Sequence, residues 1–372
     1  MSMSSILFND YPTRDGKLIV EIKLNAERSL NALTLEMIDL IQARLDEARH
    51  DDNVVAFFLD SEGEKAFCAG GDIINLYKAM TGETSSEFIE DFFTREYRLD
   101  HCIHTYEKPI ICWGSGIVMG GGMGIMNGCS HRIVTETSHL AMPEISIGLI
   151  PDVAGSWFLP RMPGKTGLFL GLTGNPINAD DALFLGLADR FIAKELKSTL
   201  IDRLQNQDWA QGATVIDKVL RELETLSGPQ RPMETPVRTY YDEIQELMDA
   251  DSLPQLVQQV LDYRTEDPWM QKAQKTLTRG SSLAMHLFYR QWQECRHRSL
   301  KEVFQSELIL AVNISRKGDF QEGVRALLID KDGRPQWQKV SQDGSTERYI
   351  DDFFSPYWDQ NHHPHPLADL GS

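Results

Sequence analysis

Long apolar runs and paired cysteines are both missing from this sequence of 372 residues. Without a run of about 18 apolar residues, no transmembrane helix is expected, and we predict no membrane partner. The cysteines are odd in number and form no C-x-x-C pair, which favours a reducing compartment and argues against a structural metal site; they are Cys68, Cys102, Cys112, Cys129 and Cys295. Basic residues are also scarce. The net charge of −18 argues against general nucleic-acid binding, which needs clustered lysine and arginine.

The ends of the chain carry no strong targeting or metal-binding signal. Residues 1–17 lack the basic-then-apolar pattern of an export signal, so we expect a cytoplasmic protein. His362, His363 and His365 lie close together near the other end, in a polar stretch interrupted by proline. For such a tail we expect flexibility rather than a metal site.

Short apolar segments in the first half of the chain predict an α/β fold. Each is β-branched or aromatic and is bounded by polar or turn residues, as buried strands are; they are residues 18–22, 54–59, 110–113 and 132–134. A helix is predicted after Thr34, a suitable N-cap, and its apolar face consists of Ile38, Ile41, Leu45 and Ala48. Strands alternating with helices indicate an α/β architecture. After about Ile192 the pattern becomes mainly helical.

Two glycine-rich turns follow predicted strands. Residues 65–72 (KAFCAGGD) lead from a strand into a helix, where exposed N–H groups stabilise negative charge. A simple connecting turn with Asp72 as the helix cap explains the same residues equally well. Residues 119–124 (MGGGMG) form either a tight strand-to-helix turn or a second set of N–H donors. A dinucleotide-binding loop is disfavoured, because the spacing is not G-x-G-x-x-G.

Two carboxylates lie eight residues apart in an apolar stretch. Glu144 and Asp152 each follow a proline, and apolar surroundings would raise the pKa of both, as acid–base catalysis near neutral pH requires. Taken singly, each has an ordinary structural interpretation: Glu144 would cap a turn, and Asp152 would be the N-cap of a helix from Val153. Glu96, on an amphipathic segment, would by local pattern be a solvated residue or an ion-pair partner of a neighbouring arginine.

With these residues in view, the chain resembles the crotonase (enoyl-CoA hydratase/isomerase) superfamily. The resemblance spans roughly residues 8–340, and its motifs are residues 24–33, 65–72 and 108–164. Residues 92–97, 141–144, 148–153, 158–161 and 319–332 narrow it to the branch of 3-hydroxyisobutyryl-CoA hydrolases. The resemblance implies a spiral of ββα repeats. It also implies a crotonase-like core at residues 8–195 and a mainly helical region at residues 196–372, which ends in a flexible tail and packs over the core.

The resemblance also implies roles for single residues. The backbone N–H groups of Gly71 and Gly121, next to Gly70 and Gly120, would form an oxyanion hole for an acyl-CoA thioester. Glu144 and Asp152 fall on the acidic catalytic positions, and Glu96 on a third carboxylate that contacts the substrate, which replaces its local interpretation. Coenzyme A is polyanionic, so local cations are needed in this acidic chain. We expect its nucleotide near Arg28, Lys65 and Lys331, although surface solvation is the ordinary interpretation of each.

One departure decides the expected reaction. Hydratases of the superfamily carry a glutamate two residues after the glycine triplet, where this chain has Gly124. Hydration would lack half of its acid–base pair, so we expect hydrolysis of a 3-hydroxyacyl-CoA thioester, as in valine breakdown. An enoyl-CoA hydratase or isomerase and a non-catalytic acyl-CoA-binding protein are the alternatives. No cofactor beyond the coenzyme A of the substrate and no metal are expected. The superfamily commonly forms trimers, so a homo-oligomer is expected.

Overall fold

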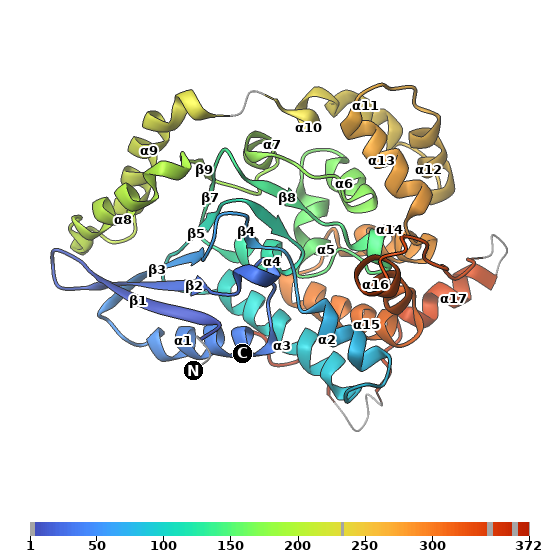
Figure 1. Ribbon diagram of the computed structural model, residues 1–372, viewed down its shortest axis with the longest axis horizontal. Helices are drawn as coiled ribbons and strands as arrows, with labels where there is room; N and C mark the ends of the chain where they lie inside the picture. Colours follow the sequence, from blue (N-terminus) through green and yellow to red (C-terminus); the bar gives the residue numbers. More distant parts are fainter. Residues whose placement is uncertain (1–3, 232–233, 341–344, 359–363, 372) are drawn as a thin grey trace. The chain divides into compact units, whose positions relative to one another are not determined.

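The computed structural model describes residues 4–231, 234–340, 345–358 and 364–371, and the chain divides into two compact units (Figure 1). The first unit consists of Met1–Gly71, Cys102–Leu140 and Pro176–Arg238, and the second of Asp72–His101, Ala141–Asn175 and Thr239–Ser372. Each unit is therefore assembled from three separate stretches of chain. The predicted division at residues 195 and 196 stays a prediction.

The first unit holds all the strands, apart from the last residue of β8. The strands are β1 (Ile6–Pro12), β2 (Leu18–Leu24), β3 (Val54–Ser61), β4 (Ala66–Cys68), β5 (Ile110–Gly114), β6 (Ile117–Met119), β7 (His131–Val134), β8 (His139–Ala141) and β9 (Arg190–Phe191). Its α-helices are α1 (Leu35–Ala48), α4 (Gly121–Gly128), α7 (Ala179–Phe184), α8 (Lys197–Gln205), α9 (Thr214–Ser227) and, apart from its last residue, α10 (Pro236–Thr239). The last three residues of α3 (Glu87–His104) also belong to this unit. Short 3-10 turns occur at η1 (Glu27–Ser29), η4 (Lys194–Leu196), η5 (Trp209–Gln211) and η6 (Gly228–Gln230).

The second unit is helical. Its α-helices are α2 (Ile73–Met80), α3 (Glu87–His104), α5 (Gly155–Phe158), α6 (Thr166–Thr173), α11 (Tyr241–Leu247), α12 (Leu253–Asp262), α13 (Pro268–Arg279), α14 (Ser282–Cys295), α15 (Leu300–Lys317), α16 (Phe320–Val324) and α17 (Ser345–Phe353). The 3-10 turns η2 (Glu144–Ile147) and η3 (Leu159–Arg161) and the π-helical turn η7 (Arg325–Ile329) complete it. Among the described residues, no helix is long and apolar enough to cross a membrane.

The main sheet of the first unit confirms the α/β prediction. Its strand order is β1-β2-β3-β5-β7-β9, and only the β1–β2 pair is antiparallel. The four predicted strands correspond to β2, β3, β5 and β7. A parallel sheet covered on both faces is built from near-continuous apolar strands. This explains why the four strands could be predicted from their apolar sequence. The predicted helix is α1, where the Thr34 hydroxyl accepts a hydrogen bond from Met37 N at 3.2 Å.

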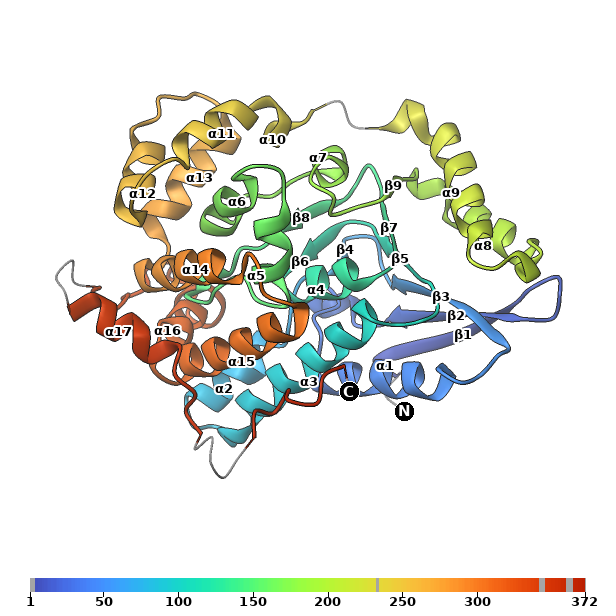
Figure 2. The same ribbon diagram turned by 180° about the vertical axis from the view of Figure 1, so that it is seen from behind.

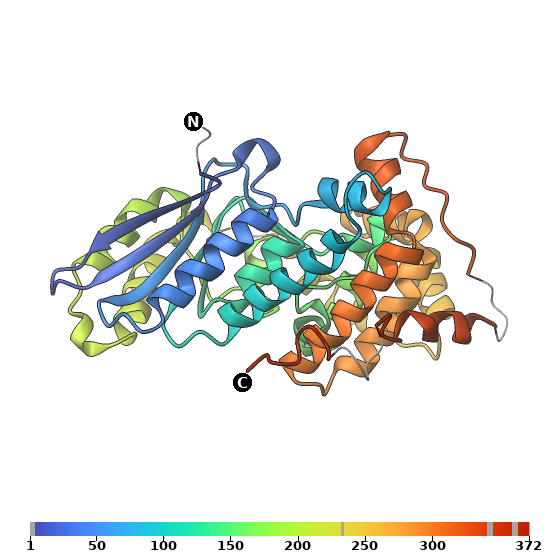
Figure 3. The same ribbon diagram turned by 90° about the horizontal axis from the view of Figure 1, so that it is seen from below.

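Alternate residues of β3 identify the two covered faces of this sheet. Phe58 belongs to a buried cluster with residues of α8 and α9, and Figure 3 shows these yellow-green helices against the blue strands. Successive strand residues point to opposite faces. Accordingly, Phe57 packs against Tyr106, whose hydroxyl donates to the carbonyl of Leu45 in α1. Helices α8 and α9 thus belong to the sheet unit.

Helices α3 and α15 run side by side in the second unit, as Figure 2 shows in cyan and orange. The rings of Tyr97 and Phe304, one on each helix, have centroids 5.7 Å apart. The described end of the chain, residues 364–371, is packed rather than free of the fold. Leu367 is fully buried, and Arg98 of α3 forms an ion pair with Asp369. His365 Nε2 lies 3.0 Å from the carbonyl oxygen of Gln305. His362 and His363 lie outside the described residues.

Candidate active site

The structure brings the two predicted glycine turns together within the first unit. Strands β4 and β6 pair in parallel, so their carboxyl ends lie at the same edge. Gly70 follows β4 with φ +121°, and Gly120 follows β6 with φ +49°, conformations that favour glycine. A Cβ on Gly122 would lie 2.4 Å from the carbonyl oxygen of Cys68. Glycine is therefore needed here for close approach of two backbones as well as for the turn.

The backbone N–H groups of Gly71 and Gly121, one in each turn, take no part in the hydrogen bonds of the described strands and helices. Leu33 N donates to the carbonyl oxygen of Gly70 at 2.8 Å, and this bridge does not use the N–H of Gly71. Gly121 is the first residue of α4, where an N–H group has no acceptor within the helix. These are the two N–H groups to which the family resemblance assigns the role of oxyanion donors, and that role stays a prediction.

The simpler interpretation of the first turn, in which Asp72 caps the following helix, is also correct. In the second unit, which begins at Asp72, this side chain accepts a hydrogen bond from Asn75 N at 3.1 Å and caps α2. Asp72 is thus accounted for as a helix cap. The capping role explains the aspartate but not the two glycines before it.

The second unit buries the three predicted carboxylates. Glu96 is 3%, Glu144 4% and Asp152 5% exposed. The local interpretation of Glu96 as a solvated or ion-paired residue is therefore wrong. The neighbouring arginines have other partners, since Arg95 pairs with Asp91 and Arg98 with Asp369.

The segment after Asp152 differs from its predicted form. A helix capped by Asp152 was expected from Val153, but α5 begins at Gly155 and its N-cap is Ala154. Val153 and Ala154 have φ of +49° and +68°, which costs on the order of 1–3 kcal/mol for each such residue. The side chain of Asp152 is thereby released from capping. It accepts a hydrogen bond of 2.6 Å from the hydroxyl of Tyr97.

A carboxylate from another helix holds this strained segment. Glu307, in the middle of α15 and fully buried, accepts hydrogen bonds of 2.9 Å from the N–H groups of Ala154 and Ser156. These are N–H groups at the start of α5, where a carboxylate is favoured. Glu307 therefore does the capping that the sequence had suggested for Asp152.

The buried carboxyl groups titrate far from their usual range. Burial raises the pKa of Glu144 well above its ordinary value, and the charge of Asp152 adds to this effect. Burial likewise raises the pKa of Glu96, with added repulsion from Asp100, Asp152 and Glu144. Asp152 rises only to a pKa of about 6, because the Tyr97 hydroxyl stabilises its charged form. Burial and mutual repulsion thus favour the neutral forms of Glu96 and Glu144, whereas the Tyr97 hydroxyl favours the charged form of Asp152.

Sequence reasoning missed three members of this cluster. Tyr97 and Asp100 lie one and four positions after Glu96 on α3, and Asp100 is fully buried with both oxygens lacking a hydrogen-bond partner among the described residues. Burial raises the pKa of Asp100, and that of Glu307 to about 8. The i, i+4 spacing of Glu96 and Asp100 places both on one helix face. Glu307, an acid within the apolar run after Ser306, was the other available signal.

The remaining predicted residues are less constrained. Arg28 and Lys65 of the first unit and Lys331 of the second are exposed. Gly124 is buried within α4. All five cysteines lie in the described residues, are buried and form no disulfide. Across the described part of the chain, no group of three or more histidine, cysteine, aspartate or glutamate side chains is arranged to hold a metal ion.

Comparison with known proteins agrees with this architecture. Residues 19–354 match the family model of the enoyl-CoA hydratase/isomerase family. The chain belongs to this family. Its fold is the crotonase fold, as in two solved structures that align over nearly all of it. One is described as an enoyl-CoA hydratase from Rhodobacter sphaeroides, with TM-score 0.80, 32% identity and coverage of 95% of this chain and 98% of that one. The other is described as a carnitinyl-CoA dehydratase from Mycobacterium thermoresistibile, with TM-score 0.84, 28% identity and 100% coverage of both.

A curated relative points to one branch of the family. The mitochondrial 3-hydroxyisobutyryl-CoA hydrolase of Danio rerio is 37% identical over 338 residues, which cover 90% of this chain and 86% of that protein. The relative and the two solved structures are thus named for different reactions on coenzyme A thioesters.

Proposed function

We propose that this protein hydrolyses a 3-hydroxyacyl-CoA thioester, with 3-hydroxyisobutyryl-CoA as the substrate and 3-hydroxyisobutyrate and coenzyme A as the products. The observation that carries the proposal is the buried carboxyl cluster of the second unit, in which Tyr97 holds Asp152 at 2.6 Å beside buried Glu96 and Glu144. Family membership and the name of the zebrafish relative support the substrate class. The corresponding process is valine breakdown.

In this proposal the backbone N–H groups of Gly71 and Gly121 stabilise the negative charge that develops on the thioester oxygen. Donors aimed at such an oxyanion contribute roughly 3–4 kcal/mol each. Gly70 and Gly120, whose positive φ angles shape the two turns, hold these donors in place. The step adds the elements of water across the C–S bond, so the acyl carbon gains oxygen and the coenzyme leaves as a thiol.

The carboxyl groups supply the acid–base chemistry. Glu144 either activates the attacking water or attacks the carbonyl itself, giving an anhydride that water then opens. Asp152 and Glu96 orient the 3-hydroxyl group and assist proton transfer. Burial and the charge of Asp152 raise the pKa of Glu144 well above its ordinary value, so its ionised form becomes more abundant as pH rises. If Glu144 is the base or nucleophile, kcat/KM should rise with pH as Glu144 ionises, with its acidic limb above the ordinary range of a glutamate.

A hydratase or dehydratase is the second candidate, because the two solved structures are described by such activities. Gly124 argues against it, since the position two residues after the triplet carries no carboxylate for handling water. A non-catalytic acyl-CoA-binding protein is a third candidate. A binder has no use for several uncompensated buried carboxyl groups, which disfavour folding.

One assay separates these candidates. The protein is incubated with 3-hydroxyisobutyryl-CoA and, separately, with crotonyl-CoA, while free thiol and double-bond absorbance are followed. Thiol release from the first substrate alone is the expected result. Loss of double-bond absorbance from crotonyl-CoA without thiol release would replace the proposal by hydration. No change with either substrate would favour the third candidate, a non-catalytic acyl-CoA-binding protein.

Further features of the proposal follow the family. The substrate brings the coenzyme A, and no resident cofactor is proposed. A trimer-type homo-oligomer is proposed as the assembly. Buried cysteines that form no disulfide suit a reducing compartment. We propose the cytoplasm as the location, although the zebrafish relative is named as mitochondrial. Fractionation of the native host cells, with detection by antibody, would test this location.

A further inference from the structure

The backbone that follows Asp152 is held by a side chain from another helix of the same unit. The two residues after Asp152 have φ of +49° and +68°. Glu307, in the middle of α15, accepts hydrogen bonds of 2.9 Å from the N–H groups of Ala154 and Ser156. The N–H group between them, that of Gly155, donates to the carbonyl oxygen of Asp152 at 2.6 Å. Three successive N–H groups are therefore satisfied without the side chain of Asp152.

Two of these N–H groups are those that Asp152 would bind if it capped the helix. An N-cap side chain accepts hydrogen bonds from the N–H groups two and three residues ahead, which here belong to Ala154 and Gly155. The helix would then begin at Val153, and both positive φ angles would return to the right-handed region that L-residues favour. The Asp152 carboxyl would face its own backbone instead of the Tyr97 hydroxyl, which now donates to it at 2.6 Å. The observed conformation therefore competes with one that local preference favours.

Glu307 is an unusual group to find in this position. It is fully buried, and it forms no ion pair within the described part of the chain. Burial raises its pKa to about 8, and the charge of Asp152 adds to the rise. A buried carboxyl group disfavours folding unless hydrogen bonds compensate it, and here the compensation comes from the N–H groups of Ala154 and Ser156. The energetic cost of Glu307 is thus tied to the conformation of this one turn.

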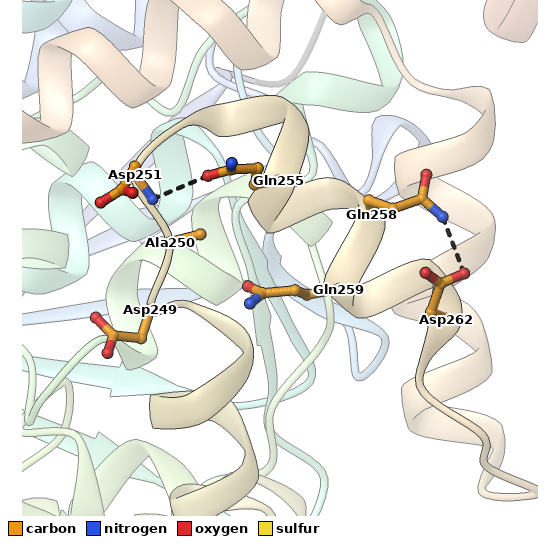
Figure 4. A pocket seen from close by; sticks show the side chains of 7 residues that line it. All are labelled: Asp249, Ala250, Asp251, Gln255, Gln258, Gln259 and Asp262. Carbon is orange, nitrogen blue, oxygen red and sulfur yellow. Dashed lines mark hydrogen bonds between the residues drawn. The ribbon is translucent and has the colours of Figure 1, made fainter.

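An acidic cavity elsewhere in the helical unit provides a contrast. It measures about 570 Å³ and is lined by Asp249, Asp251 and Asp262 with three glutamines and an alanine (Figure 4). These aspartates are exposed to water. Asp249 pairs with Lys165, and Asp262 accepts a hydrogen bond of 2.9 Å from a glutamine one helical turn before it. Such exposed contacts contribute little, and neither of them holds a backbone turn, whereas both hydrogen bonds of Glu307 do.

The titratable groups that interact with Glu307 or Asp152 include no cation among the described residues. Besides these two carboxyl groups, they are Glu96, Tyr97 and Asp100 of α3, Glu144 of η2 and Cys295 of α14. Attraction to a positive charge therefore does not fix the direction of the Asp152 side chain. Hydrogen-bond donors do, and the available donors are the Tyr97 hydroxyl and the N–H groups of its own turn.

We propose that Glu307 is a positioning residue for the reaction, because it occupies backbone N–H groups that the Asp152 side chain would otherwise cap. Asp152 is thereby left to face Tyr97 and the 3-hydroxyl group of the substrate. The proposal rests on the proposed function for the role of Asp152. It extends the site to the middle of α15, which lies outside the motifs of the family resemblance.

The first test is a ligand-free crystal structure of Glu307→Gln. Glutamine keeps the size of the side chain, but its amide nitrogen is a donor, so one of the two backbone N–H groups loses its acceptor. We expect the Asp152 carboxyl to leave the Tyr97 hydroxyl and to accept from the N–H group of Ala154 or Gly155. An Asp152 side chain that stays on Tyr97, with the turn unchanged, would overturn the proposal.

A double-mutant cycle measures the same coupling in solution. Glu307→Gln should lower kcat for 3-hydroxyisobutyryl-CoA by about ten-fold or more, with KM within about three-fold of the parent. Tyr97→Phe should move the acidic limb of kcat/KM in the parent. In Glu307→Gln it should move nothing further, because Asp152 no longer links the two side chains. Equal effects of Tyr97→Phe in both backgrounds would indicate a packing role and would also overturn the proposal.

Two further variants separate positioning from loss of stability. Glu302→Gln removes an exposed carboxylate of the same helix, which accepts from Ser299 N at 2.8 Å, so it should lower stability without changing the pH profile. Ala154→Gly removes the Cβ that disfavours a positive φ. Added to Glu307→Gln, it should restore kcat by about two- to five-fold. If Glu307→Gln alone does not fold, the combined variant is compared with Ala154→Gly. A further loss of kcat on adding Ala154→Gly would contradict the proposal.

The crystal structure separates this proposal from the proposed function, since it needs no turnover. If the parent hydrolyses the thioester but Asp152 stays on Tyr97 in Glu307→Gln, the positioning role falls and the function stands. If the parent hydrolyses nothing but Asp152 turns to its own backbone in the variant, the function falls and the hold of Glu307 on Asp152 stands.

Discussion

The two units offer different kinds of atoms to the proposed chemistry. The sheet unit presents backbone N–H groups from two glycine turns, which need no side chain and do not titrate. The helical unit presents side-chain carboxyl groups, whose properties depend on burial and on one another. A backbone donor is fixed by local conformation, whereas a catalytic carboxyl group is tuned by its surroundings. Mutations in the two units should therefore impair catalysis in different ways.

The largest effect is expected from Glu144→Gln in the helical unit. The substitution keeps the size of the side chain but removes its acid–base function, so thiol release should fall by at least about a thousand-fold. Binding of coenzyme A should be largely unchanged, as measured by titration calorimetry. The exposed Glu246→Gln in α11 is the matched control and should behave as the parent. Near-normal turnover in Glu144→Gln would refute the catalytic assignment.

In the sheet unit, Gly122→Ala should impair the backbone donors. Its Cβ would lie 2.4 Å from the carbonyl oxygen of Cys68, so β4 and α4 must separate and the N–H groups of Gly71 and Gly121 must shift. We expect kcat to fall about a hundred-fold, with no change in the shape of the pH profile. The control is Gly228→Ala, where an added Cβ meets nothing within 4 Å.

A change of pH profile in Gly122→Ala would contradict the separation of backbone and side-chain roles. Thermal unfolding of the same variant, followed by circular dichroism, shows whether the fold survives. The comparison is made below the unfolding temperature of the variant. If kcat then equals that of the parent, the two turns do not position the donors.

The same contrast explains what the sequence could predict. The strands β2, β3, β5 and β7 are near-continuous apolar segments, so local pattern was sufficient to predict them. The short strands β4 and β6, which the glycine turns follow directly, were not predicted. The environment of the carboxylates was not local. Glu307 reaches the segment after Asp152 from more than 150 positions away, and the burial of Asp100 depends on the packing of α3. Local pattern therefore misassigned both the cap at Asp152 and the environment of Glu96. The family resemblance replaced the interpretation of Glu96, whereas the structure corrected the cap.

A smaller, diagnostic effect is expected from Tyr97→Phe. The hydroxyl donates to Asp152 at 2.6 Å and lowers the pKa of that carboxyl, which burial alone would hold above the present value of about 6. Without the donor the acidic limb of kcat/KM should move to higher pH. Activity at pH 6 should fall by up to about ten-fold and recover in part as the pH rises. A uniform loss at every pH would indicate a packing defect instead.

The smallest effect concerns stability. Burial raises the pKa of Asp100 above that of the unfolded chain, so this group favours the fold while it is protonated and ceases to do so as pH rises. In Asp100→Asn the neutral side chain cannot ionise. The variant should therefore gain about 2–4 °C in Tm relative to the parent between pH 5 and pH 8. Asp91→Asn, an exposed change on the same helix, is the control. A gain that is independent of pH would show that Asp100 does not titrate with folding, and would remove it from the tuned carboxyl cluster that distinguishes the helical unit from the sheet unit.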